Sequence, residues 1–352
     1  MAGKNEKNKK ETKRMLMLTD GSFDQASARV RAILYIPMFK ESGINVCHIP
    51  RIPLKPHSLF SKYFTFPLVK RFLWIKRAFF LIFRKWDIIF IQRTFISEWM
   101  LSKIKKRAFI IYDFDDALYL QGNRRRNAEK TALMIKYADS VVVSTDYLNT
   151  FVMQFNKKAT IIPSPVETER IFPQVNKVQH EIPVVGWAGS EWTVEYITKI
   201  ESALQKLANE ITFKFLIVGA NSSFSISGVD CTVRPWSFER ECDDLNEMDV
   251  GIMPLPDDEF AKAKGGYKLY LYMAAGIPCV ASPVGINNII IRHGENGFLA
   301  DSEKEWIDSL RILLTDAKLR KTMGRTGREY AMKYYDRKIC FMSIMEIIDG
   351  LI

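Results

Sequence analysis

Short, uninterrupted apolar runs recur along the chain, and most are followed by a longer stretch with helical spacing. The runs in the first half cover residues 15–18, 44–49, 87–92, 108–112 and 140–144. Those in the second half cover residues 183–187, 213–218, 250–253 and 278–281. Apolar runs of this length are typical of parallel strands that are buried on both faces. The sequence therefore predicts an α/β protein with two doubly wound, Rossmann-like domains.

The spacing of apolar residues between these runs predicts the helices. They are expected at residues 28–42, 194–209, 239–247, 266–275, 303–315 and 317–334. A chain of 352 residues suits two domains. The polar, proline-marked stretch 163–183 separates the two sets of strands. We therefore assign residues 15–177 to an N-terminal domain and residues 178–336 to a C-terminal domain.

The polar, lysine-rich residues 1–14 are expected to be a disordered tail and not a signal peptide, because no apolar run follows them. No stretch of 18 uncharged apolar residues occurs, so no transmembrane helix is predicted and a cytoplasmic protein is expected. Five scattered cysteines, none in a Cys-x-x-Cys pair, suggest reduced thiols. Four scattered histidines give no basis for a metal site.

A formal net charge of +11 favours an anionic partner, which could be nucleic acid, a phosphorylated substrate or acidic lipid. In doubly wound sheets, ligands bind outside the carboxyl ends of the strands. Two such domains facing each other would form a cleft, and this cleft is the predicted active site.

Gly189 and Ser190 directly follow a predicted strand and precede a helix. A glycine there lets the backbone approach a ligand closely. A serine and the N–H groups of a helix N-terminus can bind phosphate. The alternative is an ordinary strand-to-helix turn with a serine N-cap.

A second candidate is the loop Lys264-Gly265-Gly266-Tyr267-Lys268, which precedes a helix. Backbone N–H groups of the glycines and the two ammonium groups could surround a diphosphate. A departing nucleoside diphosphate needs such stabilisation. The alternative is a flexible polar turn with solvated lysines.

Acidic and basic residues also follow two strands of the first half. Asp113, Asp115 and Asp116 could accept protons, hold sugar hydroxyls or bind a metal, or they could form an acidic helix N-terminus. Arg29 and Arg31 cannot face the same way on a helix, so one could reach an anionic or sugar group while the other is solvated.

Residues 51–86 contain nine Lys or Arg, no Asp or Glu, and many aromatic side chains. Lys70, Arg77 and Arg84 recur every seven residues, which predicts one basic helical face. Such a segment fits the surface of an anionic membrane. The alternatives are a core helix with a solvated basic edge and, less suited to bulky aliphatic residues, a nucleic-acid surface.

With these segments identified, the chain resembles family 4 of the glycosyltransferases, the group 1 glycosyltransferases, which share the GT-B fold. The second half carries the resemblance in the strings PVVGWAGS, PLPDDEFAKAKGGYKLYLYMAAGIPCVASPVG, HGENGFLA and MGRTGREY. The first half resembles the family more loosely, through ASARVRA and YDFDDALY.

The resemblance implies a nucleotide-sugar donor in the C-terminal domain, an acceptor in the N-terminal domain, retention of anomeric configuration and no cofactor or metal. It implies that residues 337–352 pack back on the N-terminal domain. The residues implied near the donor are Gly189, Ser190, the loop from Lys264 to Lys268, Ser282 and Gly285. Arg29, Arg31 and Asp113 are the candidate acceptor residues. Lys264, Lys268, Asp115 and Asp116 are the candidate catalytic residues.

The sequence departs from the family at two positions. The family often has two glutamates with seven residues between them, one at the donor sugar and one at the nucleotide ribose, and these positions are Ala263 and Leu271 here. Neither side chain can accept a hydrogen bond. The basic pair that usually follows the glycine turn is replaced by Glu191-Trp192-Thr193, which gives Lys264 and Lys268 more weight.

The resulting hypothesis is a retaining glycosyltransferase. It would use a UDP-, GDP- or ADP-sugar and an acceptor that is a sugar or lipid-linked, at the inner face of the plasma membrane, in surface polysaccharide or glycoconjugate synthesis. No nucleic-acid partner is expected. The alternatives are a GT-B protein that binds a nucleotide without transferring sugar, and a basic nucleic-acid-binding protein.

Overall fold

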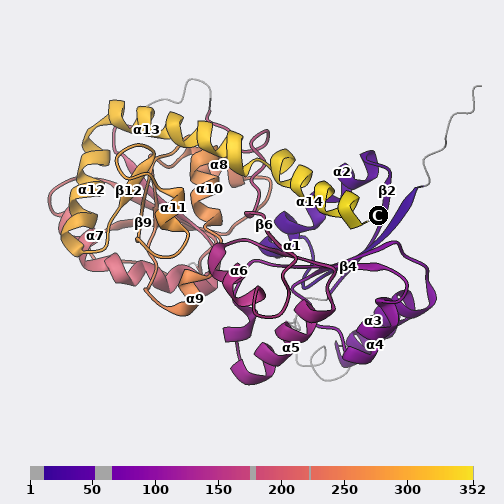
Figure 1. Ribbon diagram of the computed structural model, residues 1–352. Coiled ribbons are helices and arrows are strands. Elements are labelled where there is room, and N and C mark those ends of the chain that lie inside the picture. Colours follow the sequence, from indigo (N-terminus) through magenta and orange to yellow (C-terminus); the bar gives the residue numbers. More distant parts are fainter. Residues whose placement is uncertain (1–11, 52–65, 175–179, 222, 352) are drawn as a thin grey trace, which may run out of the picture. The chain divides into compact units, whose positions relative to one another are not determined.

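The computed structural model describes residues 12–51, 66–174, 180–221 and 223–351 and forms two compact units (Figure 1). The first unit contains the described residues up to Ser144, Leu148–Ile162 and those from Ile344 onward. The second contains Thr145–Tyr147 and Pro163–Ser343. The chain passes into the second unit at Pro163, so the described residues 163–174, which the sequence assigned to the N-terminal domain, belong to the second unit. Most of the predicted tail lies outside the described residues.

A six-stranded sheet forms the centre of the first unit, and all its neighbouring strands are parallel. In spatial order the strands are β2 (Ile44–Pro50), β1 (Lys13–Thr19), β3 (Ile88–Gln92), β4 (Phe109–Phe114), β5 (Ser140–Val143) and β6 (Ala159–Ile161). Strand β1 begins two residues before the predicted run, so Lys13 and Arg14 belong to the sheet and not to the tail. Strand β6 was not predicted.

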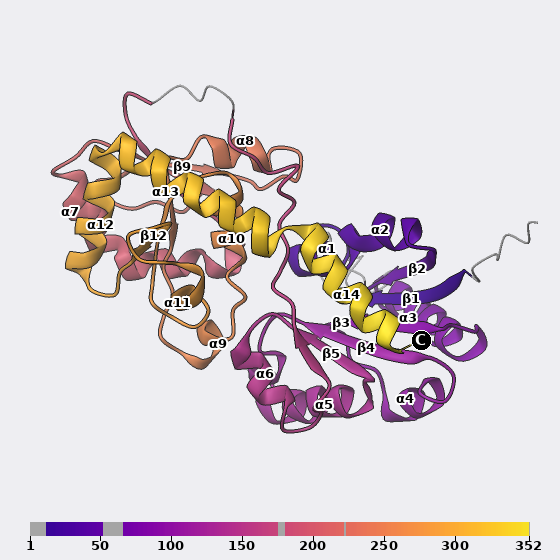
Figure 2. The same ribbon diagram turned by 45° about the horizontal axis from the view of Figure 1, so that its top comes forward.

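The helices of the first unit connect these strands (Figure 2). They are α1 (Ala26–Arg31), the short 3₁₀ helix η1 (Ile33–Tyr35), α2 (Ile36–Glu41), α3 (Phe66–Phe83), α4 (Glu98–Ile104), η3 (Leu118–Leu120), α5 (Arg124–Tyr137) and α6 (Asp146–Val152). The single helix predicted at 28–42 is broken at Ala32, where φ is −138° and ψ is −60°. Pro37 then opens a new helix near its N-terminus, a position that proline tolerates.

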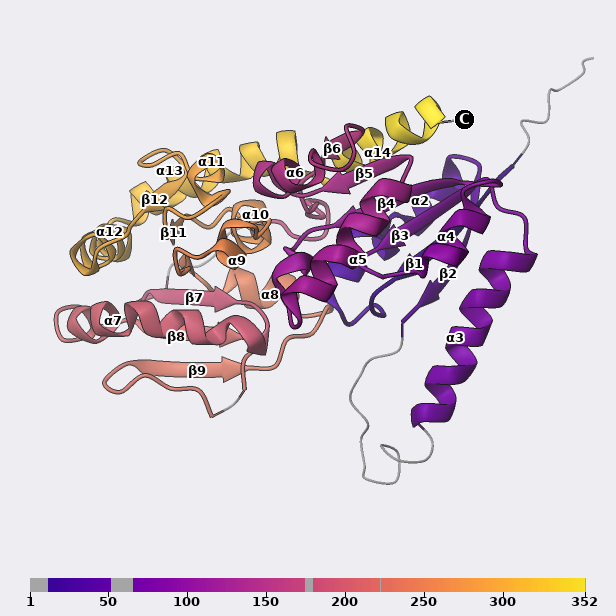
Figure 3. The ribbon, with the colours of Figure 1, turned by 60° about the horizontal axis from the view of Figure 1, so that its bottom comes forward.

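The second unit has its own six-stranded parallel sheet, in which β7, β8 and β9 run side by side (Figure 3). In spatial order the strands are β12 (Gly297–Leu299), β11 (Cys279–Ala281), β10 (Val250–Met253), β7 (Val184–Ala188), β8 (Lys214–Val218) and β9 (Asp230–Arg234). Sequence patterns predicted the four inner strands and missed β9 and β12, which form the two edges.

The helices of the second unit are η4 (Glu191–Ile200), α7 (Glu201–Ala208), α8 (Glu241–Asn246), α9 (Glu259–Lys262), α10 (Tyr267–Ala274), α11 (Asn287–Ile290), α12 (Glu303–Thr315), α13 (Ala317–Tyr330) and the π-helical turn η5 (Ala331–Tyr335). The last helix, α14 (Arg337–Leu351), begins in the second unit and ends in the first. The helices predicted for the second unit occur near their predicted positions, although the first is divided into η4 and α7, and α9 and α11 were not predicted. Helix α12 has both the predicted bounds and a capping box between Ser302 and Glu305.

Each sheet reverses its strand order at one place. In the first unit the reversal lies between β1 and β3, and in the second it lies between β7 and β10. Neighbouring loops diverge at such a switch point, which makes it the usual ligand site of an open α/β sheet. The fold therefore directs attention to the residues that follow β1 and β3 and to those that follow β7 and β10.

A tyrosine fills the opening between β7 and β10. The two strands are paired only at Val250–Val185 and Gly251–Gly186. Beyond these pairs, the hydroxyl of the buried Tyr272 on α10 accepts from Ala188 N–H at 3.0 Å and donates to Ile252 C=O at 3.2 Å. Tyr272 therefore replaces the missing ladder contacts and attaches α10 to the switch point.

Replacing Tyr272 by phenylalanine keeps the ring but removes this bridge. Because unsatisfied buried polar groups cost about 1–3 kcal/mol, we expect the free energy of unfolding of the second unit to fall by about that amount. Urea unfolding followed by circular dichroism measures it. Tyr334→Phe is the matched control, since Tyr334 is 42% exposed, and a change of under about 0.5 kcal/mol is expected there. Equal losses in the two variants would contradict the bridging role.

Candidate functional site

The turn after β7 is built by close backbone approach. Gly189 N–H donates to Val218 C=O at 3.0 Å, which continues the β7–β8 ladder past the end of β7. Gly219, which follows β8 with a φ of +90°, lies so close that a Cβ there would overlap the carbonyl of Gly189. The turn therefore presents backbone, with little side chain, at the switch point of the second sheet.

Lys268 lies against this turn. A methyl group added to Gly189 would come within 2.5 Å of Lys268 Cε and 2.6 Å of the Trp187 ring. Lys268 Nζ is 5.0 Å from the centre of the Trp187 ring and 3.4 Å from Thr193 Oγ1. The first turn of α10 therefore places an ammonium group beside the Gly189–Ser190 turn.

Lys264 reaches the same region from the start of the loop. Its Nζ is 4.5 Å from the centre of the Phe260 ring and 5.9 Å from that of Tyr196, on α9 and η4. Gly265 follows it, and Gly266, with a φ of +70°, is the N-cap of α10. No acidic residue lies in the first turn of α10, which begins at Tyr267. A helix start with this charge pattern suits an anion.

Ser282 and Gly285 have structural partners of their own. The hydroxyl of Ser282 accepts from Leu255 N–H at 3.0 Å and so joins the loops that follow β10 and β11. Gly285 has a φ of +55°, and a Cβ added to it would lie 2.5 Å from the carbonyl oxygen of Lys262. Both residues shape the loops at this edge of the sheet.

The two positions that depart from the family pattern are apolar and buried. Ala263 and Leu271 lie in the core of the second unit. Neither position presents a hydrogen-bond acceptor to a ligand, so a sugar or ribose contact at this edge needs other groups.

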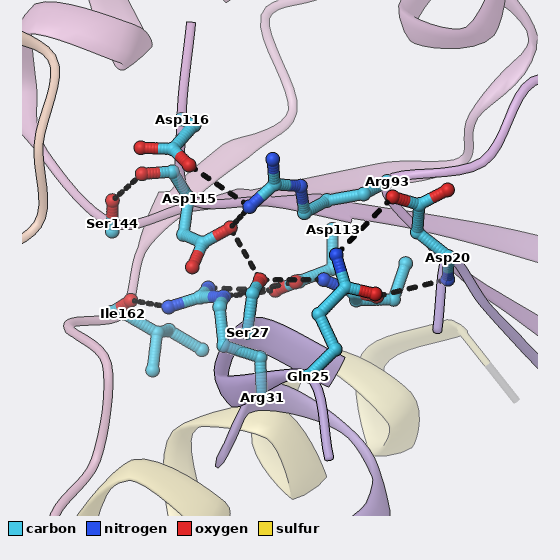
Figure 4. A network of polar contacts seen from close by, with 11 residues as sticks. Asp20, Gln25, Ser27, Arg31, Arg93, Asp113, Asp115, Asp116, Ser144 and Ile162 are labelled. Carbon is cyan, nitrogen blue, oxygen red and sulfur yellow. Dashed lines mark hydrogen bonds and ion pairs between the residues drawn. The ribbon is translucent and has the colours of Figure 1, made fainter. Parts of the chain in front are cut away.

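The first unit holds a polar network at the ends of β1, β3 and β4 (Figure 4). At its base, the guanidinium of Arg31 on α1 pairs with Asp113 at the end of β4, with Nη2–Oδ2 at 2.6 Å and Nε–Oδ1 at 2.9 Å. Arg31 Nη1 also donates to Ile162 C=O at 3.0 Å. Both side chains are 1% exposed. Arg31 and Asp113 were predicted to contact an acceptor, but the structure places them beneath the surface, bound to each other.

Arg29, the other predicted acceptor residue, is also buried. Its Nη1 donates to Phe23 C=O at 2.9 Å, and its guanidinium lies over the Phe23 ring at 5.6 Å. Arg29 therefore holds the loop after β1 in place. Burial also affects the acidic partner of Arg31: it raises the pKa of Asp113, although the charge of Arg31 opposes this rise.

Asp115 and Asp116 lie above this pair and share the guanidinium of Arg93. Arg93 Nη1 donates to Asp115 Oδ1 at 3.2 Å and to Asp116 Oδ2 at 2.9 Å. Ser27 O–H donates to Asp115 Oδ1 at 2.6 Å. Burial alone would raise the pKa of Asp115, but the charges of Arg93 and Arg31 and the Ser27 hydrogen bond outweigh it and lower that pKa. Asp115 is therefore held as an anion that orients Arg93.

Sequence reasoning missed Arg93 and Gln92. Buried Gln92 donates from Nε2 to Ser27 Oγ at 2.7 Å and accepts from Asp20 N–H at 3.3 Å. A polar pair directly after the apolar run 88–91 was the available signal. Among the residues that the structure describes, no group of three or more His, Cys, Asp or Glu side chains could hold a metal ion.

Helix α3 presents a second surface, where it lies beside α4 (Figure 3). The sequence predicted that Arg77 lies on an outward basic face of this helix, and this prediction is wrong. Arg77 Nη2 donates inward, to Thr19 C=O at 2.6 Å and to Ile49 C=O at 2.9 Å. Burial, together with the charge of Arg51, lowers the pKa of Arg77 to about 10. The side chain of Lys70 lies outside the described residues.

The outward face of α3 is apolar. Phe72, Ile75, Phe79 and Phe83 recur every three or four residues and are between 50 and 71% exposed. The side chains of Arg71, Lys76 and Arg84 are exposed beside them. We call these four apolar residues the α3 stripe. No helix in the described part of the chain is long and apolar enough to cross a membrane.

Two units, each with a parallel six-stranded sheet and a switch point, define the GT-B fold, as predicted. Solved structures of this kind share the fold over nearly the whole chain. A sucrose-phosphate synthase from Thermosynechococcus elongatus is 13% identical, with a TM-score of 0.72 over 96% of this chain and 99% of that one. A glycosyltransferase from Rickettsia africae has a TM-score of 0.69 at 12% identity, over 97% of this chain and 98% of that one. The Anabaena protein HepE, solved with UDP and glucose, has a TM-score of 0.66 at 15% identity, over 96% of this chain and 100% of that one.

Within this fold, residues 182–316 match the family model described as glycosyl transferases group 1, which confirms the predicted family for this segment. The segment contains the Gly189 turn and both lysines of the loop before α10. A curated relative, N-acetyl-alpha-D-glucosaminyl L-malate synthase of Bacillus anthracis, is 26% identical over 147 residues. That alignment covers 39% of this chain and spans 37% of the length of the relative.

Replacing Arg31 by alanine leaves Asp113 buried without its partner. Breaking one side of a buried ion pair costs about 3–5 kcal/mol, so we expect the free energy of unfolding of the first unit to fall by about this amount. Chemical denaturation measures the loss. Arg125→Ala is the control, because the Arg125 side chain is 92% exposed in its pair with Glu129 and should contribute under about 1 kcal/mol. A loss of under about 1 kcal/mol for Arg31→Ala would show that the Arg31–Asp113 pair does not stabilise the first unit.

Proposed function

We propose that this protein is a glycosyltransferase that moves a sugar from a nucleotide diphosphate donor to an acceptor hydroxyl with retention of anomeric configuration. The observation that supports it best is the position of Lys268 against the Gly189–Ser190 turn, within the segment that matches the group 1 glycosyltransferases. The donor would lie at the switch point of the second sheet. The solved HepE complex with UDP-glucose, which shares the fold, is consistent with a nucleotide-sugar donor.

The proposed chemistry needs stabilisation of the leaving group. When the bond between the sugar and the diphosphate breaks, negative charge develops on the phosphate oxygen. The ammonium groups of Lys264 and Lys268 and the N-terminus of α10 would stabilise this charge. In this proposal, transfer uses no cofactor, and the two lysines supply the neutralising charge.

The double variant Lys264→Ala, Lys268→Ala tests this assignment. Removing a preorganised charge-stabilising group typically costs 10²- to 10³-fold in kcat, so we expect a loss of about 10²-fold or more in turnover of UDP-, GDP- or ADP-sugars. Release of the nucleoside diphosphate is the readout. Lys318→Ala is a control on an exposed lysine of α13. Wild-type turnover in a folded double variant would remove the two lysines from the mechanism. Nucleotide binding by the wild type without any turnover would instead favour the non-transferring alternative.

We further propose that the acceptor is lipid-linked or close to a membrane, and that α3 rests on an anionic bilayer at the inner face of the plasma membrane. The support is the α3 stripe, an apolar face of the kind that marks interaction sites. Exposed basic side chains flank it, and each can add about 1 kcal/mol of attraction to anionic lipid. Such an acceptor fits a role in surface polysaccharide or glycoconjugate synthesis.

Vesicle flotation tests the membrane proposal. We expect the wild type to float with anionic vesicles at low salt and the triple variant Phe72→Ser, Phe79→Ser, Phe83→Ser to stay at the bottom, because the variant lacks the apolar face. The matched control replaces three exposed apolar residues of the second unit, Ile289, Ile312 and Met332, by serine. Equal flotation of the two triple variants would exclude the α3 stripe as the contact. A salt-dependent gel shift with RNA, without flotation, would favour the nucleic-acid alternative.

A further inference from the structure

Arg93 occupies the switch point of the first sheet. It is the residue that follows β3, and β1, on the other side of the reversal, leads into Asp20. Its φ of +53° is the only left-handed value at a non-glycine position in the described part of the chain. Its own N–H donates to Asp113 C=O at 2.9 Å, which fixes the backbone in this conformation. The strained turn directs the side chain toward the ends of the strands.

The guanidinium of Arg93 uses only part of its hydrogen-bonding capacity. Nη1 donates to both Asp115 and Asp116, and Figure 4 shows the remaining terminal nitrogen directed away from these carboxylates. Among the described residues, neither Nε nor Nη2 has a hydrogen-bond partner, although the side chain is only 12% exposed. A guanidinium has five N–H donors, and leaving buried ones unused is costly. Nε is fully buried, so Nη2 is the unused donor that a ligand can reach.

The surroundings of Arg93 decide which ligand class fits. Asp116 is 24% exposed, so a carboxylate acceptor lies next to the N–H donors of Arg93. Two carboxylates already surround this single guanidinium, and an anionic ligand group would be repelled by them. A hydroxyl group is neutral and both donates and accepts. Two neighbouring hydroxyls match an arginine and a carboxylate side by side, one accepting from Arg93 and the other donating to Asp116.

We infer that Arg93 and Asp116 bind the acceptor of the proposed transferase, and that this acceptor presents a pair of neighbouring, uncharged hydroxyls, as a sugar or polyol does. Calling the bound ligand an acceptor rests on the proposed function, but binding of the ligand does not require sugar transfer. Asp115 and Ser27 are positioning residues, because they hold the guanidinium through Nη1 and make no use of its outer donors.

A direct binding experiment tests this site without a donor. The probes are methyl glycosides of glucose, galactose, mannose and N-acetylglucosamine, each with deoxy analogues that lack one of two neighbouring hydroxyls. Saturation-transfer NMR on the full chain measures binding. We expect at least one glycoside to bind the wild type, and Arg93→Met to weaken that binding by about tenfold or more, since hydrogen bonds to charged groups are the strong ones. Arg125→Met, on an exposed arginine, should bind like the wild type.

Two further comparisons separate a binding role from a structural one. Asp116→Asn keeps the shape of the side chain but turns half of the acceptor into a donor, so it should also weaken binding. For the wild type, removing from the glycoside the hydroxyl that contacts Arg93 should weaken binding about as much as Arg93→Met does. The deoxy glycoside should then bind Arg93→Met only slightly more weakly than it binds the wild type, because the two changes remove the same hydrogen bond. Additive losses would overturn the pairing.

The inference fails if no glycoside binds, if Arg93→Met binds them like the wild type, or if sugar phosphates bind more tightly than neutral glycosides through Arg93. The proposed function has a separate test, because release of nucleoside diphosphate from a nucleotide sugar does not depend on the glycoside. If the protein releases nucleoside diphosphate but does not bind the glycosides, only the inferred class of acceptor is wrong. If the protein binds glycosides through Arg93 but does not turn over a nucleotide sugar, the proposed transferase activity is wrong and the glycoside-binding site is supported.

Discussion

A single hydroxyl, that of Tyr272, determines how the candidate donor site is built. Where β7 and β10 separate, their backbone groups lose each other as partners, and Tyr272 satisfies Ala188 and Ile252 instead. The ring fits because Gly251 has no side chain to collide with it. Since Tyr272 lies one turn after Lys268 on α10, the same contact sets the rotation of the helix. The ammonium of Lys268 reaches the Gly189 turn as a consequence.

In the first unit, too, buried polar side chains hold the ends of the strands in place, but they are a charged pair and not a neutral hydroxyl. Arg31 and Asp113 form a buried pair under the strand ends, and this pair carries Ser27, Asp115 and Arg93 above it. A buried ion pair contributes little net stability compared with apolar packing, but it tolerates few alternative geometries. Its value here lies in fixing where the Arg93 guanidinium stands. Both units therefore place a buried polar contact beneath the residues proposed to bind a ligand.

Local sequence patterns were sufficient for the inner strands but missed three of the four edge strands. Inner strands such as β4, β7 and β8 are covered on both faces, so their sequences are continuous apolar runs. The missed strands β6, β9 and β12 are all at sheet edges. They are three to five residues long, and β9 includes Asp230 and Arg234. The break of the helix predicted at 28–42 depends on tertiary packing around Ala32, which spacing alone does not encode.

The candidate site divides in the same way. The proximity of Gly189 and the loop from Lys264 to Lys268 could be predicted, because both lie between a predicted strand and the helix that follows it, at the same edge of the sheet. The arginines could not, because an arginine side chain is long enough to turn inward or outward from the same backbone position. Arg31 and Arg77 turned inward, while the only signal for Arg93 was its place, with Gln92, directly after an apolar run. Their directions are set by carboxylates and carbonyls that are distant in sequence.

The inward turn of Arg77 has a mechanical consequence. Its guanidinium holds the carbonyl of Thr19, the residue that precedes Asp20 at the switch point of the first sheet. The α3 stripe is on the opposite side of the same helix. The α3 stripe and the loop beside Arg93 are therefore connected through one helix and one side chain.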